Sequence, residues 1–192
     1  MNDELERLFA QIHTIEDTIE RRLDSQRAQF KYRLTNGKAV FEAEIKRMHR
    51  RLRTGVWRYL RGTRLKHVAV APVIYAMVIP LVLFGLSFSA YQWICFTFWG
   101  IRRVPRRQYV VVDRHRLAYL NVIEKLNCIY CGYANGVLAY VREITGRTEQ
   151  YWCPIRHATQ LRGPHSRYKA FVDYGDAEGY RTRLEELRAK LR

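Results

Sequence analysis

An uncharged run over residues 68–101 restricts this chain more than any other feature of its sequence. About 20 consecutive apolar residues are enough to cross a lipid bilayer, and a water-soluble domain has little use for a longer apolar run. A buried helix in a soluble core is the alternative, but Pro72, Pro80 and Gly85 are expected to break such a helix. The run therefore predicts a segment inside a membrane.

The length of this run leaves two topologies open. One straight helix would extend roughly 50 Å, well beyond the hydrocarbon core, whereas each arm of a symmetric hairpin would reach only about 24 Å. Both flanks of the run are basic, and basic flanks favour the cytoplasmic side of a membrane. We therefore expect a re-entrant segment or a short two-helix hairpin that turns near residues 85–87, with both termini cytoplasmic. A single span followed by an interfacial helix over residues 91–100 is the alternative.

The two flanks hold much of the positive charge of a chain with 34 lysines and arginines against 18 aspartates and glutamates. Trp57, Tyr59 and Leu60 interleave with the first flank, as on basic helices that bind membrane surfaces. The same cations suit nucleic-acid phosphates, but the adjacent apolar run makes anionic lipid the more economical partner. The residues expected to bind the membrane surface are Arg50, Arg51, Arg53, Arg58, Arg61, Arg64, Lys66, Arg102, Arg103, Arg106 and Arg107.

Residues 1–66 are expected to form a helical hairpin that ends in this basic face. Leucines and isoleucines recur three and four apart at positions 5, 8, 12, 15, 19 and 23, which indicates an amphipathic helix with a short heptad seam. Asn36 and Gly37 tolerate the backbone conformation that ends a helix, and a second apolar pattern runs from Phe41 to Leu52. The seam either closes the hairpin or allows the protein to self-associate as a coiled coil.

The third part, residues 103–192, carries the spacing of a four-ligand metal site. Cys128 and Cys131 form a Cys-x2-Cys pair, and Cys153 and His157 follow about twenty residues later. Three thiolates and one imidazole are a usual ligand set for structural zinc. Pro154 suits the first position of a helix, which would place Cys153 at the helix cap and favour its thiolate.

Periodic apolar residues predict short helices around this motif, one that closes at Asn127, one that Asn135 caps, and a last one over residues 180–191. Gly132 would allow the backbone to turn around the ion. Two other uses of the cysteines remain open. Iron in an electron-transfer role would take the same ligands, and Cys128 and Cys131 alone could form a redox disulfide.

Catalytic signatures are absent from the sequence, which favours a non-enzymatic role. There is no nucleophile elbow, phosphate-binding glycine loop or dinucleotide fingerprint. Glu124, Glu143 and Glu149 lack the Glu-x-x-His pairs of a carboxylate-bridged di-iron site, so we expect them to form helical salt bridges.

Several short motifs in the last two-thirds of the chain carry a resemblance. They are Leu-Asn-Cys-x-Tyr-Cys at residues 126–131 and Glu-Gln-Tyr-Trp-Cys-Pro-Ile-x-His-Ala at residues 149–158. Together with the apolar run, they resemble a family of uncharacterised bacterial membrane proteins. The resemblance implies a bacterial inner-membrane setting and no particular activity.

The sequence thus predicts a mainly α-helical protein in three parts: a helical hairpin over residues 1–66, a membrane segment over residues 67–102, and a small cytoplasmic metal-knuckle domain over residues 103–192. The expected function is a scaffold or adaptor, in which zinc orders a surface that binds another protein. A membrane-bound redox or lipid-modifying component with an iron or thiol site is one alternative. A membrane-tethered nucleic-acid binder is the other.

Overall fold

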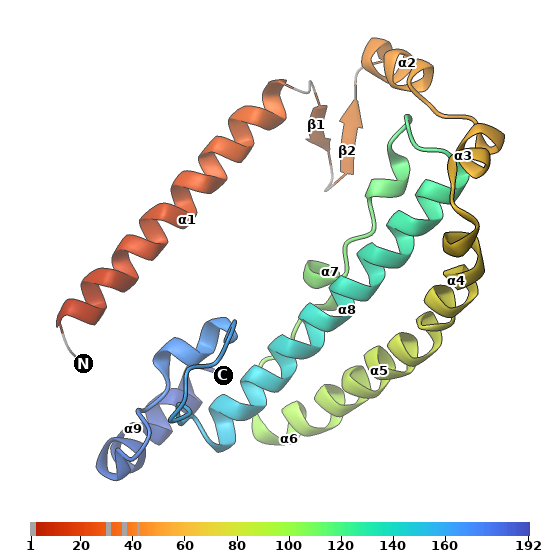
Figure 1. Ribbon diagram of the computed structural model, residues 1–192. Helices are drawn as coiled ribbons and strands as arrows, with labels where there is room; N and C mark the ends of the chain where they lie inside the picture. Colours follow the sequence, from red (N-terminus) through yellow and green to blue (C-terminus); the bar gives the residue numbers. More distant parts are fainter. Residues whose placement is uncertain (1–2, 30–31, 36–37, 42) are drawn as a thin grey trace. The chain divides into compact units, whose positions relative to one another are not determined.

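The computed structural model of the chain is mainly α-helical and describes residues 3–29, 32–35, 38–41 and 43–192 (Figure 1). The chain divides into two compact units, each described here by itself. The N-terminal unit extends to Val56 and includes residues 116–121, and the larger unit comprises residues 57–115 and 122–192. The N-terminal unit contains α1 (Asp3–Gln29), β1 (Tyr32–Thr35), β2 (Lys38–Phe41) and α2 (Ala43–Arg51).

The N-terminal unit differs from the predicted helical hairpin. Between α1 and α2, strands β1 and β2 pair antiparallel, with Tyr32 opposite Phe41. The apolar seam of α1 is exposed at its described side chains, so no other described element of this unit covers it. The side chains at positions 5 and 23, and residues 36–37, lie outside the described part. The exposed seam residues are Leu8, Ile12, Ile15 and Ile19.

The larger unit contains two long helical stretches joined by an irregular connection. The first stretch is α4 (Leu65–Ala76), α5 (Val78–Tyr91), the π-helical turn η1 (Gln92–Phe96) and α6 (Thr97–Trp99). The second is α8 (Val122–Trp152). The shorter elements are α3 (Val56–Gly62), α7 (Arg106–Tyr109), the 3-10 turns η2 (Arg114–Arg116) and η3 (Ser166–Ala170), and α9 (Ala177–Ala189).

Elements α4 to α6 form one continuous helix, Leu65–Trp99, which we call the apolar helix. The helix passes through Pro72, and a tightened turn at Met77, whose N–H donates to the carbonyl of Ile74 at 3.2 Å, precedes Pro80. It ends at Gly100, which takes the left-handed conformation (φ 68°) that glycine adopts without steric cost.

The predicted hairpin turn near residues 85–87 is wrong, because the apolar helix continues through this stretch. Gly85 has a different role. It is the only buried residue of α5, and a Cβ atom there would lie 3.3 Å from a methyl group of Val137 on α8. Glycine at this position permits close approach of two helices and does not reverse the chain.

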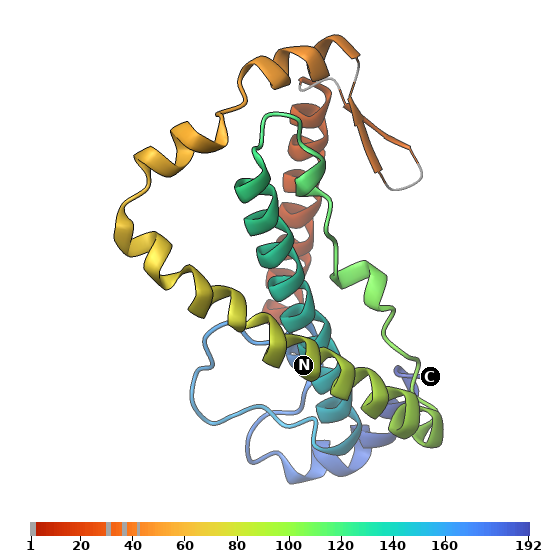
Figure 2. The same ribbon diagram turned by 90° about the vertical axis from the view of Figure 1, so that its right-hand side faces the viewer.

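The chain runs in the same direction along α8 as along the apolar helix. Asn127, Val137 and Thr148 on α8 contact Tyr75, Gly85 and Tyr91 on the apolar helix, in the same order along both chains. Figure 2 shows the apolar helix crossing α8. The core of the unit gathers around the second half of α8, and its buried members are Phe96, Ile101, Val104, Val137, Tyr140, Val141, Ile144 and Leu191.

Residues 100–115, which we call the return segment, lead back along α8 after the apolar helix ends. The backbone of this segment lies against two glycines of α8. A Cβ atom on Gly136 would be 2.7 Å from the Cα of Val110, and one on Gly132 would be 3.2 Å from the carbonyl oxygen of Val111. The two glycines therefore form a groove that holds an extended chain, in place of the turn that Gly132 was predicted to supply.

Candidate functional site

The apolar helix is the feature of the larger unit that points most directly to function. It is the one helix in the described part of the chain that is long and apolar enough to cross a membrane. Only 6% of its most apolar stretch is buried, whereas the core helix of a soluble protein is mostly buried. Leu65, Val73, Ile79 and Phe98 are each more than 60% exposed. Apolar side chains thus cover the free surface of this helix.

The side of the apolar helix that faces α8 carries its polar groups. Gln92 is buried, donates to the hydroxyl of Tyr140 and to the carbonyl of Val104 (3.3 Å), and accepts from the Val104 N–H at 2.9 Å. The hydroxyls of Tyr91 and Thr148 lie 3.0 Å apart. Trp99 stacks on Tyr151 with 5.6 Å between ring centroids. Because interhelical polar contacts and close glycine packing hold helices together without water, this pairing is suited to a lipid environment.

The cations that the sequence predicts at the membrane surface lie, with one exception, on exposed positions. Arg106 is the exception, because it donates to the hydroxyl of Tyr133 at 3.4 Å and its guanidinium lies 5.9 Å from the centre of that ring. Arg50, Arg51 and Arg53 belong to the N-terminal unit. The exposed members in the larger unit are Arg58, Arg61, Arg64, Lys66, Arg102, Arg103 and Arg107.

A cavity of about 720 Å³ lies where the basic flank meets the apolar helix, between α3, α4 and the first turns of α8. Its apolar wall includes Leu60, Val68 and Ile74, and Ile123 contributes from α8. Tyr75 and Asn127 also line the cavity, and the Tyr75 hydroxyl donates a hydrogen bond to the side-chain oxygen of Asn127. A Tyr75–Tyr130 edge contact at 6.0 Å continues this link between α4 and α8.

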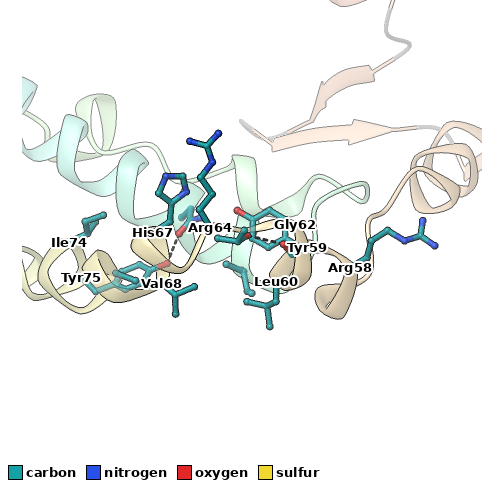
Figure 3. A pocket seen from close by; sticks show the side chains of 13 residues that line it. Arg58, Tyr59, Leu60, Gly62, Arg64, His67, Val68, Ile74 and Tyr75 are labelled. Atoms are coloured by element: carbon teal, nitrogen blue, oxygen red, sulfur yellow. Dashed lines mark hydrogen bonds between the residues drawn. The ribbon is translucent and has the colours of Figure 1, made fainter.

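The polar edge of this cavity is cationic. Arg58, Arg64 and His67 line it, and none of its lining residues carries a carboxylate. Arg64 and His67 extend side by side in Figure 3, whereas the guanidinium of Arg58 points away from them. The cavity therefore combines an apolar wall with a positively charged rim, which is the chemistry that recognises an anionic amphiphile.

A second polar cluster lies near the last turns of α8. Glu143 accepts hydrogen bonds from Arg147 (2.9 Å) and Arg167 (2.7 Å), and Arg167 also donates to Gln150 at 3.0 Å. Burial pulls the pKa of Glu143 upward, but the hydrogen bonds from Arg167 and Arg147 outweigh it and hold the pKa below its ordinary value. His165 pairs with Glu149 at 2.9 Å. The predicted helical salt bridge is confirmed for Glu143, which pairs with Arg147 one turn further along α8, whereas the partner of Glu149 lies outside the helix.

The four predicted metal ligands do not come together. Helix α8 is continuous from Val122 to Trp152, so Cys131 and Cys153 are separated by about 30 Å along its axis. Asn135 does not cap a new helix, because its side chain donates to the carbonyl of Cys131 at 2.9 Å inside α8. Among all described residues, no group of three or more potential ligands is close enough to hold a metal ion. The described residues therefore do not show the metal-knuckle, and zinc stays a prediction.

The second half of the motif also differs from its predicted local structure. Pro154 follows the end of α8 and does not begin a helix, so Cys153 lacks the helix N-terminus that would favour a thiolate. Burial, together with the nearby Glu149 carboxylate, instead raises the pKa of the Cys153 thiol. His157 stacks on Tyr168, with 6.2 Å between ring centroids. All four cysteines are free thiols, including Cys128 and Cys131, which lie one turn apart on α8.

Sequence reasoning found the cations of the cavity rim but missed its far wall. Asn127 lies 52 positions from Tyr75, and only the folded chain brings it and Ile123 to the same cavity as Tyr75. A weak signal was present, because residues 126–141 of α8 carry no charge. Comparison of the chain with protein-family models, with curated proteins and with solved structures gives no match in any of the three.

Proposed function

We propose that this protein is a non-enzymatic, membrane-anchored scaffold that inserts one side of its apolar helix into a lipid bilayer and binds an anionic phospholipid in the cavity at the basic end of that helix. The observation that carries the proposal is the exposure of a 35-residue apolar helix directly beside a cation-rimmed cavity. Exposed apolar patches of this extent mark membrane or protein contact surfaces.

The packing of α8 and the return segment supports insertion along the membrane plane more than a vertical span. At about 1.5 Å per residue the apolar helix is roughly 50 Å long, against a hydrocarbon core of about 30 Å. The return segment places arginines beside the α5–α8 pair, and Arg106 lies within 4 Å of where a Gly85 Cβ would be. A charged side chain in the bilayer centre costs at least about 2.5 kcal/mol, so this side belongs at the headgroups.

An in-plane helix also keeps both of its ends on one side of the membrane. That arrangement agrees with the basic flanks at both ends, because positively charged segments are retained on the cytoplasmic side. It needs no chain reversal at Gly85. We place the larger unit on the cytoplasmic face of a membrane, with α9 and η3 free to contact a protein partner.

The cavity gives the bound lipid a defined orientation. Its rim residues Arg64 and His67 would hold the phosphate, and Val68, Ala71 and Ile74 would contact an acyl chain. Arginine suits this task because its planar N–H groups match phosphate oxygens two at a time. The cavity opens beside the helix that is itself expected to lie in the lipid, so a bound lipid would not have to leave the bilayer.

Flotation of the full-length protein with vesicles tests this function. The protein should float with phosphatidylcholine vesicles through its apolar helix, and phosphatidylglycerol at about a quarter of the lipid should strengthen binding severalfold. The double change Arg58→Gln and Arg64→Gln should remove most of that preference.

The matched control removes two exposed arginines that do not line the cavity, Arg181→Gln and Arg162→Gln. It should retain the preference for phosphatidylglycerol, because general charge attraction falls only slightly. Equal loss in both double variants would assign the lipid preference to net charge and remove the cavity from the proposal. Failure of the unaltered protein to float with either vesicle would overturn the proposed function itself.

A further inference from the structure

A second cavity, separate from the lipid-facing one, lies at the other end of α8. Its volume is about 420 Å³, and the charged residues that line it are Arg102, Arg103, Arg147, Arg167 and Lys190. These five cations come from four separate places in the chain: the return segment, α8, η3 and the end of α9. No lining residue carries a carboxylate. Convergence of five like charges is unfavourable unless an anion compensates them.

Compensation by the protein itself is incomplete. Glu143 pairs with both Arg147 and Arg167, so one carboxylate serves two guanidiniums. Lys190 pairs with Glu186 at 2.6 Å, and both of those side chains are more than half exposed, which weakens the pair through solvent screening. Neither Arg102 nor Arg103 has an ion pair among the described residues. The cavity is left with an excess of positive charge.

The cationic groups at the bottom of this cavity are held in place. The side chains of Arg147 and Arg167 are only 14% and 24% exposed, and hydrogen bonds to Glu143 and Gln150 fix their planes. Arg147 also donates to the carbonyl of Arg102, and the Arg102 N–H donates to the carbonyl of Leu191 at 2.9 Å. A guanidinium has more N–H donors than these bonds use, so both arginines keep donors for a ligand.

We infer that this cavity binds a phosphate group. Several guanidiniums around one small space suit a compact, multiply charged oxyanion, because each presents paired N–H groups to phosphate oxygens. Arg102 and Arg103 form the exposed lip and Arg147 and Arg167 the fixed base. The phosphate belongs either to a soluble compound, such as a diphosphate, or to the headgroup of a phosphatidic-acid-like lipid, because both offer the same oxygen atoms.

The test measures binding of pyrophosphate to the full-length protein in detergent by calorimetry, at constant ionic strength. The variant Arg102→Gln/Arg103→Gln removes the lip while the backbone bonds of Arg102 remain. We expect it to weaken binding at least about tenfold, since each lost charged contact is worth roughly that factor. The control Arg162→Gln/Arg181→Gln removes two exposed charges outside the cavity and should change affinity less than about twofold.

A second arm separates the two sources of phosphate. The same variants are compared for binding to phosphatidylcholine nanodiscs with and without phosphatidic acid. Pyrophosphate binding that depends on Arg102 and Arg103 assigns a soluble ligand. If pyrophosphate has no effect but phosphatidic-acid binding falls in the lip variant and not in the control, the phosphate is a lipid headgroup. If neither measurement distinguishes the lip variant from the control, the inference is wrong.

This outcome is independent of the proposed scaffold function. The lip residues do not line the lipid-facing cavity, and Arg58 and Arg64 do not line this one. If the unaltered protein binds pyrophosphate but shows no phosphatidylglycerol preference that depends on Arg58 and Arg64, the proposed function fails and the phosphate site stands. If it shows that preference but no phosphate binding that depends on Arg102 and Arg103, the phosphate site fails and the proposed function stands.

Discussion

The apolar helix and α8 are similar in length, 35 and 31 residues, but they meet their surroundings in opposite ways. Only 6% of the most apolar stretch of the apolar helix is buried, and the helix is uncharged from residue 68 onward. Helix α8 lies between the apolar helix and the return segment and buries eight residues, three of them glycines. Hydropathy therefore identifies the helix that is apolar and exposed, while small residues identify the helix that protein packs against on two sides.

The difference also explains how a uniformly apolar helix can lie at a membrane surface. By itself the apolar helix has few polar groups, and α8 and the arginine-bearing return segment cover the face that carries Tyr91 and Gln92. The apolar helix, α8 and the return segment are amphipathic as a packed unit, whereas the apolar helix alone is not. This is a tertiary form of the one-sided polarity that interfacial helices carry in their own sequence.

A charge placed on the apolar helix should disturb membrane association far more than the same charge on α8. Leu83 and Leu138 are 60% and 52% exposed, one on each helix. Leu83→Arg should weaken vesicle binding by about 2.5–3.5 kcal/mol, roughly a hundredfold, because the arginine enters hydrocarbon. Leu138→Arg should cost less than about threefold. Equal losses in vesicle flotation would show that both helices lie in hydrocarbon.

Helix α8 should be the more sensitive of the two to added volume. Gly136→Ala would bring a Cβ atom to 2.7 Å from the Cα of Val110 and 2.8 Å from the carbonyl oxygen of Tyr109. These are backbone atoms that cannot rotate away, so we expect a loss of about 3 kcal/mol in the free energy of unfolding. Gly62→Ala is the control, since nothing lies within 4 Å of its added carbon. Unfolding followed by circular dichroism in detergent distinguishes the two.

The charge pairs at the end of α8 should make its stability depend on pH. The folded-state pKa of Glu143 lies below its ordinary value of 4.5, so this carboxylate stabilises the fold above that pH and the contribution is lost as pH falls through the folded pKa. Glu143→Gln should cost about 1–3 kcal/mol at pH 7, because Arg147 and Arg167 lose their shared partner.

The same variant should also flatten the fall in stability below about pH 4.5, the range in which a carboxylate with a lowered pKa becomes protonated. Unfolding curves between pH 3 and 7 measure both effects. An unchanged acid transition in Glu143→Gln would mean that other carboxylates govern it. Glu185→Gln, which affects an exposed pair with Arg188, is the control and should change little.

The smallest effect should follow loss of the cysteine at the end of α8. A four-ligand zinc site predicts that Cys153→Ser unfolds the C-terminal part and releases stoichiometric metal. With Cys128 and Cys131 at the opposite end of α8, we expect a change below about 0.5 kcal/mol in the free energy of unfolding, as for other exposed substitutions. Elemental analysis of the unaltered protein provides the direct check, and one bound zinc per chain would restore the metal prediction.

The sequence pattern predicted the structure correctly where a single residue property, hydrophobicity or charge, was enough to decide it. The absence of charge over residues 68–101 predicted a membrane segment, and the structure has there one helix that is long and apolar enough to cross a membrane, with exposed basic flanks. The same reasoning misplaced the two turns predicted at Gly85 and Gly132. Gly85 and Gly132 looked like chain reversals, but both lie inside helices where another segment approaches closely. A glycine permits either role, and its neighbours in space choose between them.

The predicted metal ligands lie apart for a related reason. Spacing along the sequence brings two ligand pairs together only if the chain between them turns, and α8 does not turn between Cys131 and Cys153. Its continuity depends on packing from two sides, by the apolar helix and by the return segment. The cavity between α3, α4 and α8 and the cavity lined by five cations could not be predicted from the sequence for the same reason. Each is formed by residues from distant parts of the chain.

The sequence by itself determined which surface avoids water, because hydrophobicity and charge belong to individual residues and do not depend on their partners. Tertiary structure alone decided that this surface is one-sided, that α8 is unbroken, and that cations from four places surround one cavity. Those properties depend on which segments meet, and contact between segments is set by shape and by close backbone approach rather than by any single stretch of sequence.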